Sequence, residues 1–248
     1  MSSVTSPSLH RRIVHGLGRQ ILSGKLRPGQ PLPIPAGVHA SRTALREAIK
    51  VLTAKGLVEA RPRLGTRVRP RDAWQLLDPD VLTWQHDGPA RLEFLRQLTE
   101  FREVIEPAAA AFAARRATAS DINTIERAYA DMASAASHDR VQLAKFVAAD
   151  RRFHSAIVRA SGNDLLGQMG HTVFSALVLS FRATTQRPGA ARGSLPRHRA
   201  ILEAIKRRKP NEARRAMLKL MGHTAIEVKK LDAKKDRGQA LGNGRASS

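Results

Sequence analysis

The chain has 248 residues, of which 42% are hydrophobic, and it carries a formal net charge of +22. This length allows one large domain or a small domain plus a larger one, and the hydrophobic content allows a packed core. The sequence has no cysteine, which excludes disulfides, thiol catalysis and zinc sites built from thiolates. The amino terminus lacks the apolar core of a secretory signal, and the longest apolar run, residues 173–181, is too short to cross a bilayer. We therefore expect a cytoplasmic protein without a membrane partner.

The positive charge is concentrated near the amino terminus. Residues 1–71 contain 14 Lys and Arg against two acidic residues, which accounts for +12 of the total +22. An excess of this size predicts a polyanionic partner such as nucleic acid, with a generally arginine-rich composition as the alternative. The clustering in under a third of the chain favours a nucleic-acid-binding domain in that part.

After a flexible stretch over residues 1–8, two helices are predicted. Residues 9–23 carry apolar side chains four positions apart, which places them on one helix face. The second helix spans residues 41–55, with Ser41 as its amino-terminal cap and Gly56 at its end. Its expected buried stripe consists of Leu45, Ala48, Ile49 and Leu52.

Residues 57–70 alternate in the manner of a two-stranded hairpin with "PRLG" as its turn. Two helices followed by this basic hairpin predict a winged helix-turn-helix domain over residues 9–70. The side chains off the buried stripe suit base edges in a major groove, and those of the hairpin suit phosphates. They are Arg42, Thr43 and Arg46 on the helix, and Arg61, Arg63, Arg67 and Arg69 on the hairpin. A solvated basic face is the ordinary alternative.

Residues 71–90 read as a linker that contains both tryptophans, Trp74 and Trp84. If these rings are buried, the linker is docked rather than loose. Residues 91–232 predict an all-helical domain, and the polar, glycine-rich residues 233–248 predict a disordered basic tail. The expected helices are 91–117, one opened by a capping box at Thr118–Asp121, and about 141–160, 163–184, 195–209 and 211–231. Leu95, Leu98, Val104 and Ile105 are expected to share the buried face of the first of these helices.

Several segments resemble the GntR family of bacterial repressors, specifically its FadR-type subfamily and the galactonate-operon-repressor-like group. They are "LRPGQPLP", "SRTALREAIKVLTAKGLVEARPRLGTRV" and "LLDPDVLTW". "FREVIEPAAAAFAA", "DRRFHSAIVRASGN", "HRAILEAI" and "MLKLMGH" resemble that subfamily's FCD effector domain. The resemblance covers residues 9–230 and implies a mainly α protein: an N-terminal winged helix-turn-helix followed by a C-terminal all-α bundle that also dimerises. The DNA-binding residues it implies are Ser41, Arg42, Thr43, Arg46, Arg63 and Gly65.

A carboxylate and three histidines match the subfamily's metal ligands. Asp150 and His154 are four residues apart and share a helix face, and His198 and His223 lie on two further predicted helices. Alone, such histidines are more often core or surface residues; the resemblance implies that all four bind a divalent metal. One carboxylate and three imidazoles suit Zn²⁺, Ni²⁺ or Mn²⁺. The resemblance does not decide whether His171 also occupies a ligand position.

The resemblance also implies a small carboxylate effector, such as galactonate or another sugar acid, bound near the metal. Arg102 is the expected partner of its carboxylate, with an intrahelical pair to Glu106 as an equal alternative. Asn163 and Arg182 are further candidates.

Three functions remain open at this point. The first is a ligand-responsive repressor. The second is a metal-dependent enzyme, which needs a general base near the metal, where Glu227 is the one spare acid a helical turn from a ligand. The third is a family member with weakened DNA binding. The family places a helix between "LP" and "GVSR", and "LPIPAGVHASR" here shortens it by about one turn and adds helix-breaking prolines.

Overall fold

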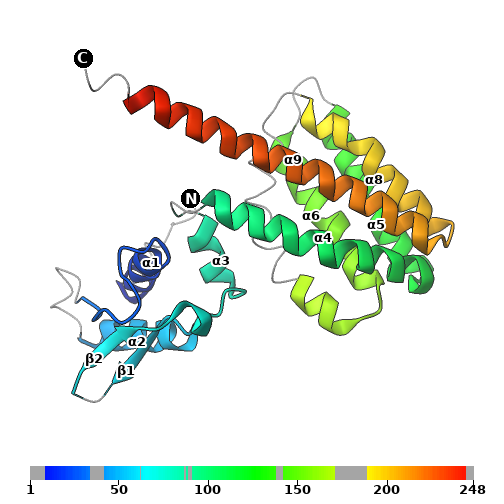
Figure 1. The fold of residues 1–248 in the computed structure, drawn as a ribbon. Coiled ribbons are helices and arrows are strands. Elements are labelled where there is room, and N and C mark those ends of the chain that lie inside the picture. The colour runs from blue at the N-terminus through cyan, green and yellow to red at the C-terminus, as the bar shows by residue number, and fades with distance from the viewer. Residues whose placement is uncertain are drawn as a thin grey trace, which may run out of the picture. The chain divides into compact units, whose positions relative to one another are not determined.

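The computed structural model describes residues 9–33, 42–61, 63–86, 88, 91–137, 142–170 and 189–243, with residues 42, 86 and 232–243 described as backbone only. The chain divides into two compact units, Met1–Arg91 and Leu92–Ser248. Figure 1 shows the first in blue to cyan, with the one hairpin of the described residues, and the second in green to red as helices. The predicted mainly α fold is confirmed.

The first unit has the predicted order of helix, helix and hairpin, followed by a further short helix (Figure 1). Its elements are α1 (Leu9–Leu22), α2 (Arg42–Ala54), β1 (Val58–Arg61), β2 (Gly65–Val68), the 3₁₀ turn η2 (Arg71–Ala73) and α3 (Pro79–His86). The strands are antiparallel, with Val58 opposite Val68 and Arg61 opposite Gly65. This is a winged helix-turn-helix in which β1 and β2 form the wing.

The proline-containing segment after α1 begins as an additional edge of the wing sheet. Pro31 forms an isolated antiparallel bridge with Arg67, and the Leu32 N–H donates to the carbonyl of Thr66 at 2.8 Å. Prolines are compatible with such an edge because they need not donate to the ladder. Residues 34–41, on which the prediction of a shortened helix depends, lie outside the described residues.

The recognition-type helix α2 packs as its sequence predicts. Ala48 and Leu52 are fully buried, and Leu45 and Ile49 are half-buried. Gly56 ends the helix at a φ of 72°, and a Cβ at this position would overlap the carbonyl oxygen of Ala73. Both the left-handed backbone and the close approach require glycine here.

The predicted linker contains helix α3, which is docked on the first unit. Trp84 is fully buried, and its indole Nε1–H donates to Nδ1 of His15 on α1 at 2.7 Å. Lys55 lies 2.8 Å from Asp78 and 2.7 Å from Asp80. Burial opposes the charge of Lys55, but hydrogen bonds and attraction from the two carboxylates outweigh it and raise its pKa. These contacts join the segment before residue 87 to the DNA-binding unit as one body.

Adding a methyl group at Gly18 tests this docking. The Cβ of a Gly18→Ala variant would overlap the six-membered ring of Trp84, so we expect a loss of about 1–3 kcal/mol in the free energy of unfolding. Gly16→Ala on the same helix is the control, because no atom lies within 4 Å of its added Cβ; it should stabilise the helix by about 0.5–1 kcal/mol. Tryptophan fluorescence during denaturation reports on this unit alone, since both tryptophans of the chain belong to it. Equal effects of the two variants would contradict the docking.

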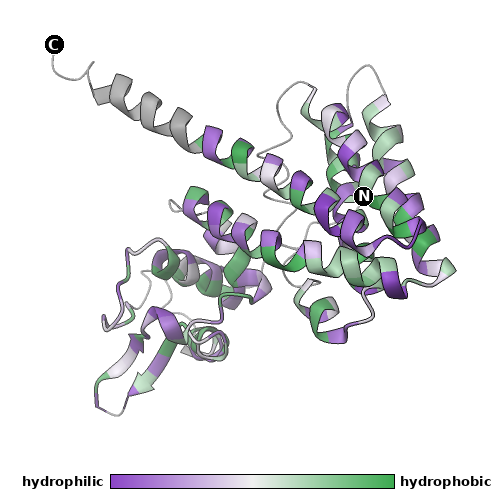
Figure 2. Cartoon of the chain, turned by 45° about the vertical axis from the view of Figure 1, so that its right-hand side comes forward, coloured by the Kyte–Doolittle hydropathy of each residue, from purple (hydrophilic) through white to green (hydrophobic). Residues whose placement is uncertain are grey.

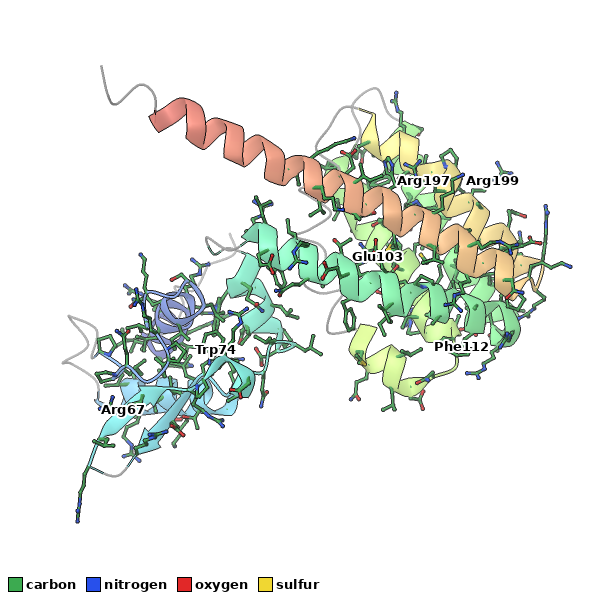
Figure 3. All side chains as sticks on the ribbon, viewed as in Figure 1. Arg67, Trp74, Glu103, Phe112, Arg197 and Arg199 are labelled. Carbon is green, nitrogen blue, oxygen red and sulfur yellow. The ribbon has the colours of Figure 1, made fainter. Side chains whose placement is uncertain are left out.

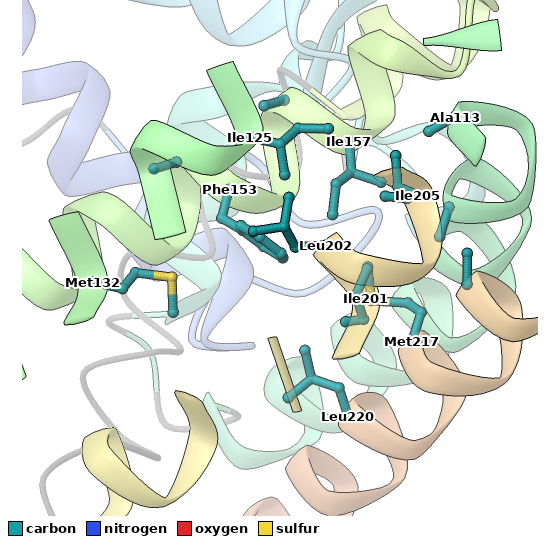
Figure 4. Packing of buried hydrophobic residues seen from close by; sticks show 14 of the residues in the cluster. Ala113, Ile125, Met132, Phe153, Ile157, Ile201, Leu202, Ile205, Met217 and Leu220 are labelled. Carbon is teal, nitrogen blue, oxygen red and sulfur yellow. The ribbon is translucent and has the colours of Figure 1, made fainter. Parts of the chain in front are cut away.

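The second unit is a bundle of α-helices. Its elements are α4 (Arg91–Arg116), α5 (Ala119–Ser137), α6 (Leu143–Ala160), α8 (Ala190–Lys206) and α9 (Pro210–Asn243), and residues 164–170 are also helical. Their inner faces supply one apolar core (Figure 4), in which Ile125, Phe153, Ile157, Ile201 and Met217 are fully buried. Figure 2 shows that hydrophobic and hydrophilic residues alternate along the helices of this unit.

The predicted capping box at the start of α5 is confirmed. The backbone N–H of Thr118 donates to Asp121 Oδ2 at 2.9 Å, and the Asp121 N–H donates to Thr118 Oγ1 at 3.1 Å. The reciprocal bonds satisfy donors that the first helical turn leaves open.

Two expectations for this unit differ from the structure. Val104 is 72% exposed, because the buried stripe of α4 passes through polar Arg102 and Glu106 instead. The backbone of α9 continues to Asn243, where a disordered tail was expected from residue 233. Alanine, lysine, glutamine and leucine in this segment are good helix formers, which outweigh the polar composition.

Among the described residues, none of the helices combines the length with the apolar character that crossing a bilayer requires.

Candidate functional site

The predicted DNA-reading side chains lie on the exposed side of α2. Thr43 and Arg46 are exposed, on the side away from buried Ala48 and Leu52. The backbone of Arg42 is helical, but its side chain and all of Ser41 lie outside what the structure describes. Arg46 therefore presents its guanidinium to solvent from the amino-terminal half of a supported helix, as groove readout requires.

The four arginines of the wing do not have equal roles. Arg61 pairs with Glu59 at 2.6 Å, and Arg67, labelled in Figure 3, donates from Nη1 to the carbonyl of Gly29 at 2.7 Å. Arg67 thus braces the wing against the preceding segment. Arg63 is exposed at the turn with a φ of 61°, and Gly65 follows with a φ of 72°. Arg63 and half-buried Arg69 remain as the wing's candidates for phosphate contact.

A second candidate site lies inside the helical unit. Asp150 and His154 of α6 and His198 of α8 are all buried, and one ligand atom from each lies within 4.8 Å of the other two. Nε2 of His198 is 2.9 Å from Asp150 Oδ1, and Nε2 of His154 is 3.8 Å from the same oxygen. The ring of Phe153 packs edge-on against both imidazoles. Three of the four predicted metal ligands are therefore brought to one buried point.

Hydrogen bonds set the orientation of both imidazoles. Nδ1 of His154 lies 2.6 Å from Glu106 Oε2, and Nδ1 of His198 lies 3.0 Å from the carbonyl oxygen of Ser194. A carbonyl and an ionised carboxylate only accept, so both Nδ1 atoms carry protons. When each imidazole is neutral, its Nε2 atom then has no proton and presents a lone pair toward Asp150.

Such an arrangement brings acceptors together without a proton between them. Nε2 of His198 lies close to Asp150 Oδ1 but outside hydrogen-bonding geometry, and Asp150 Oδ2 has no hydrogen-bond partner among the described residues. Buried acceptors at this spacing repel each other unless a cation or an added proton lies among them. Bonds of about 2.0–2.2 Å to a shared ion place ligand atoms roughly 3–4 Å apart. The three side chains therefore fit a divalent metal.

The charges around this cluster favour its ionised form. Burial raises the pKa of Glu106, but Arg102, whose Nε donates to Glu106 Oε1 at 2.5 Å, and His154 outweigh it, and the pKa falls to about 2. Burial likewise raises the pKa of Asp150, yet the adjacent imidazole of His198, followed by His154 and Arg102, brings it below its ordinary value. The carboxylates of Asp150 and Glu106 and the guanidinium of Arg102 together carry a net charge of −1. A bound divalent cation would make the net charge of the cluster positive.

The remaining predicted site residues are placed differently. His223 is exposed on α9 and does not belong to the group of three. The side-chain oxygen of Asn163 accepts from the Leu166 N–H at 3.1 Å and so caps helical residues 164–170. Arg182 and His171 lie outside the described residues. The effector roles of Asn163 and Arg182, and the ligand role of His223, stay predictions.

Glu106 is the functional residue whose position sequence reasoning missed. The sequence indicates Glu106 only as a possible ion-pair partner of Arg102. The structure shows that Glu106 also fixes the tautomer of His154. The signal was available in the spacing: Arg102 and Glu106 continue the helical stripe of buried Leu95, Leu98 and Ala109. Two opposite charges on a buried stripe indicate an internal pair.

A Glu106→Gln variant tests this orienting role. Loss of a carboxylate that orients a ligating histidine weakens metal binding by about 10–100-fold. The change also removes the partner of buried Arg102 and should cost about 3–5 kcal/mol of stability. Zn²⁺ affinity from competition with a chelating dye, corrected for the folded fraction, separates the two effects. Glu103→Gln on the same helix is the control; unchanged zinc affinity of folded Glu106→Gln would leave only the structural role.

Comparisons with known proteins agree with this two-part organisation. Residues 97–223 match the FCD domain, and residues 9–68 match the bacterial regulatory proteins of the gntR family. A relative, the galactonate operon transcriptional repressor of Escherichia coli (strain K12), is 34% identical over 225 residues, which is 89% of this chain and 96% of the relative. The chain belongs to the GntR family. It is a GntR-family transcription regulator with an FCD domain, and not an enzyme.

Other relatives of this GntR-family protein include the Glc operon transcriptional activator of Escherichia coli (strain K12). It is 28% identical over 213 residues, 82% of each chain. Among solved structures, Lar, which controls expression of the Listeria monocytogenes agr system, aligns with a TM-score of 0.63. That alignment covers 92% of this chain and 99% of Lar at 20% identity, and it supports the fold alone. The GntR-type helix-turn-helix implies binding to operator DNA.

Proposed function

We propose that this protein is a ligand-responsive repressor of an operon for the catabolism of a sugar acid or related carboxylate. A homodimer would bind a double-stranded operator through two winged helices, as two-fold DNA sites require. The similarity to the galactonate operon repressor and to the Glc operon activator supports the class of operon. The higher identity to the repressor, 34% against 28%, favours repression.

The buried Asp150, His154 and His198 cluster carries the proposal of an effector site. With a divalent ion of zinc, nickel or manganese held by these side chains, the charges of Asp150, Glu106, Arg102 and the ion would add up to +1. A buried site with that charge favours a monoanionic ligand, such as an aldonic acid. The ion would supply open coordination positions for carboxylate or hydroxyl oxygens.

Arg102 is the second element of this proposed pocket. Its guanidinium is buried beside Glu106 and close enough to Asp150 to lower that residue's pKa, although less than His198 and His154 do. A guanidinium offers five donors, so its bond to Glu106 is compatible with a contact to an effector carboxylate. Arg182 and Asn163 complete the set of predicted effector contacts.

Regulation requires that the effector bind two arrangements of the protein with different affinities. In the first unit, α3 is fixed through Trp84, Lys55 and Asp78, so a displacement of the chain at α3 would be transmitted to α1 and α2. We propose this connection as the route by which effector binding alters DNA binding.

Operator binding measured by fluorescence anisotropy tests the proposal. The probe is duplex DNA from upstream of the protein's own gene, at several salt concentrations, with and without galactonate, gluconate or lactate. We expect sequence-specific binding that at least one of these acids weakens. Binding that is independent of sequence and disappears with salt would contradict specific repression and support the weakened-binding alternative.

A further inference from the structure

A groove rich in arginine lies on the surface of the helical unit, away from the metal cluster. It has a volume of about 470 Å³ and is bounded by α5, α6 and helical residues 164–170. Its basic side chains are Arg127, Arg151, Arg152 and Arg159, and its small or apolar ones are Ala128, Val158, Gly167 and Gly170. Small residues between helices leave room for a ligand to approach the backbone.

The positive charge of this groove is only partly neutralised. Of the described side chains that line it, Asp131 is the one carboxylate, and it lies 2.9 Å from Arg152. Arg127 donates to the backbone carbonyl of Asn123 at 3.4 Å, a contact that leaves its charge uncompensated. The guanidiniums of Arg127, Arg151 and Arg159 therefore line the groove without an ion pair to any carboxylate in its lining.

The groove and the metal cluster use different faces of the same helix. Asp150 and His154 point to the buried centre, whereas Arg151 and Ser155 follow each by one residue and line the groove. One residue corresponds to a rotation of about 100° on an α-helix. The groove is therefore a separate site, with α6 as the wall that it shares with the metal cluster.

The lining selects the chemistry of the ligand. Guanidinium groups form paired hydrogen bonds to phosphate oxygens, and the hydroxyl of Ser155 adds a donor. The volume falls within the range of about 300–1,000 Å³ that is usual for small-molecule sites. We propose that this groove binds a small phosphorylated molecule that carries at least two negative charges.

Titration calorimetry of the full chain with inorganic pyrophosphate, at constant ionic strength, tests this assignment. The groove variant Arg151→Gln/Arg159→Gln is compared with Arg214→Gln/Arg215→Gln, which removes the same charge from exposed positions of α9. We expect the groove variant to bind pyrophosphate at least about tenfold more weakly, since each lost charge-assisted bond contributes to affinity. The α9 variant should bind as the parent does.

Several results would overturn the assignment. The first is that the parent does not bind pyrophosphate, and the second is that both variants bind it equally weakly. The third is that the groove variant binds it as the parent does, which is the result expected if pyrophosphate chelates a metal held by the protein. A loss of binding to random-sequence duplex DNA as large as the loss of pyrophosphate binding would identify a nucleic-acid surface instead. If the double variant does not fold, Ser155→Asp places a carboxylate in the groove and should weaken pyrophosphate binding as well.

Discussion

Replacement of His154 with alanine is expected to lower the affinity for Zn²⁺ by more than about 100-fold, because loss of an outer hydrogen-bond partner alone costs about 10–100-fold. The variant removes one of three converging buried ligands and also frees Glu106 from its histidine. Metal content per chain, measured by plasma emission spectrometry after dialysis, should fall close to zero. The response of operator binding to effector should be lost with it.

The matched control for this experiment is His10→Ala, which removes an exposed histidine from the other unit. It should retain the parent's metal content. Metal retained in His154→Ala with the parent's affinity would remove this residue from the ligand set. His223→Ala tests the predicted fourth ligand in the same assay: a clear loss would add His223 to the site, and full occupancy would leave the three buried side chains as the ligands from the described residues.

Replacement of Arg46 with alanine is expected to weaken operator binding by about 1–3 kcal/mol, or roughly 5–150-fold, if its guanidinium contacts a guanine. Arg46 is exposed on α2, while Ala48 and Leu52 hold the helix in the core, so the substitution should not disturb the fold. The preference for operator over random DNA should decrease as well. Anisotropy titrations with both duplexes measure the two effects.

A general loss of charge must be separated from a loss of base recognition. Lys25→Ala is the control, because it removes one exposed positive charge from the same unit, outside α2. We expect it to affect operator and random DNA equally. If Arg46→Ala also weakens both equally, Arg46 contacts phosphate rather than a base. If it binds the operator as the parent does, α2 is not the reading helix.

Individual helices and their caps could be predicted from the sequence, because the patterns that specify them involve residues close together in the chain. Leu45, Ala48, Ile49 and Leu52 specify the inner face of α2 by helical spacing alone. The capping box of Thr118 and Asp121 is likewise a local pattern with a local result. The extension of α9 was not predictable from composition, because its glycines and charged residues are typical of disorder although good helix formers lie between them.

The candidate metal site could be predicted in part. Asp150 and His154 share a face by spacing, but only family resemblance connected them with His198, 44 positions later. Their burial, the shared point between α6 and α8, and the proton positions set by Glu106 and Ser194 depend on how the helices pack. The same holds for Arg67, which reads as a phosphate contact in the sequence and braces the wing in the structure.

The sequence by itself determined the two-part organisation, the family and the basic DNA-binding unit, and it supplied the candidate site residues. Composition, helical periodicity and motif order are properties of the chain that need no knowledge of distant contacts. Only the tertiary structure decided that α3 is docked through Trp84 and His15, that Glu106 orients His154, and that three of the four arginines of the surface groove lack a carboxylate in its lining. Each of these depends on side chains brought together from different helices, and hydrogen bonding and burial act through distance in space rather than separation along the chain.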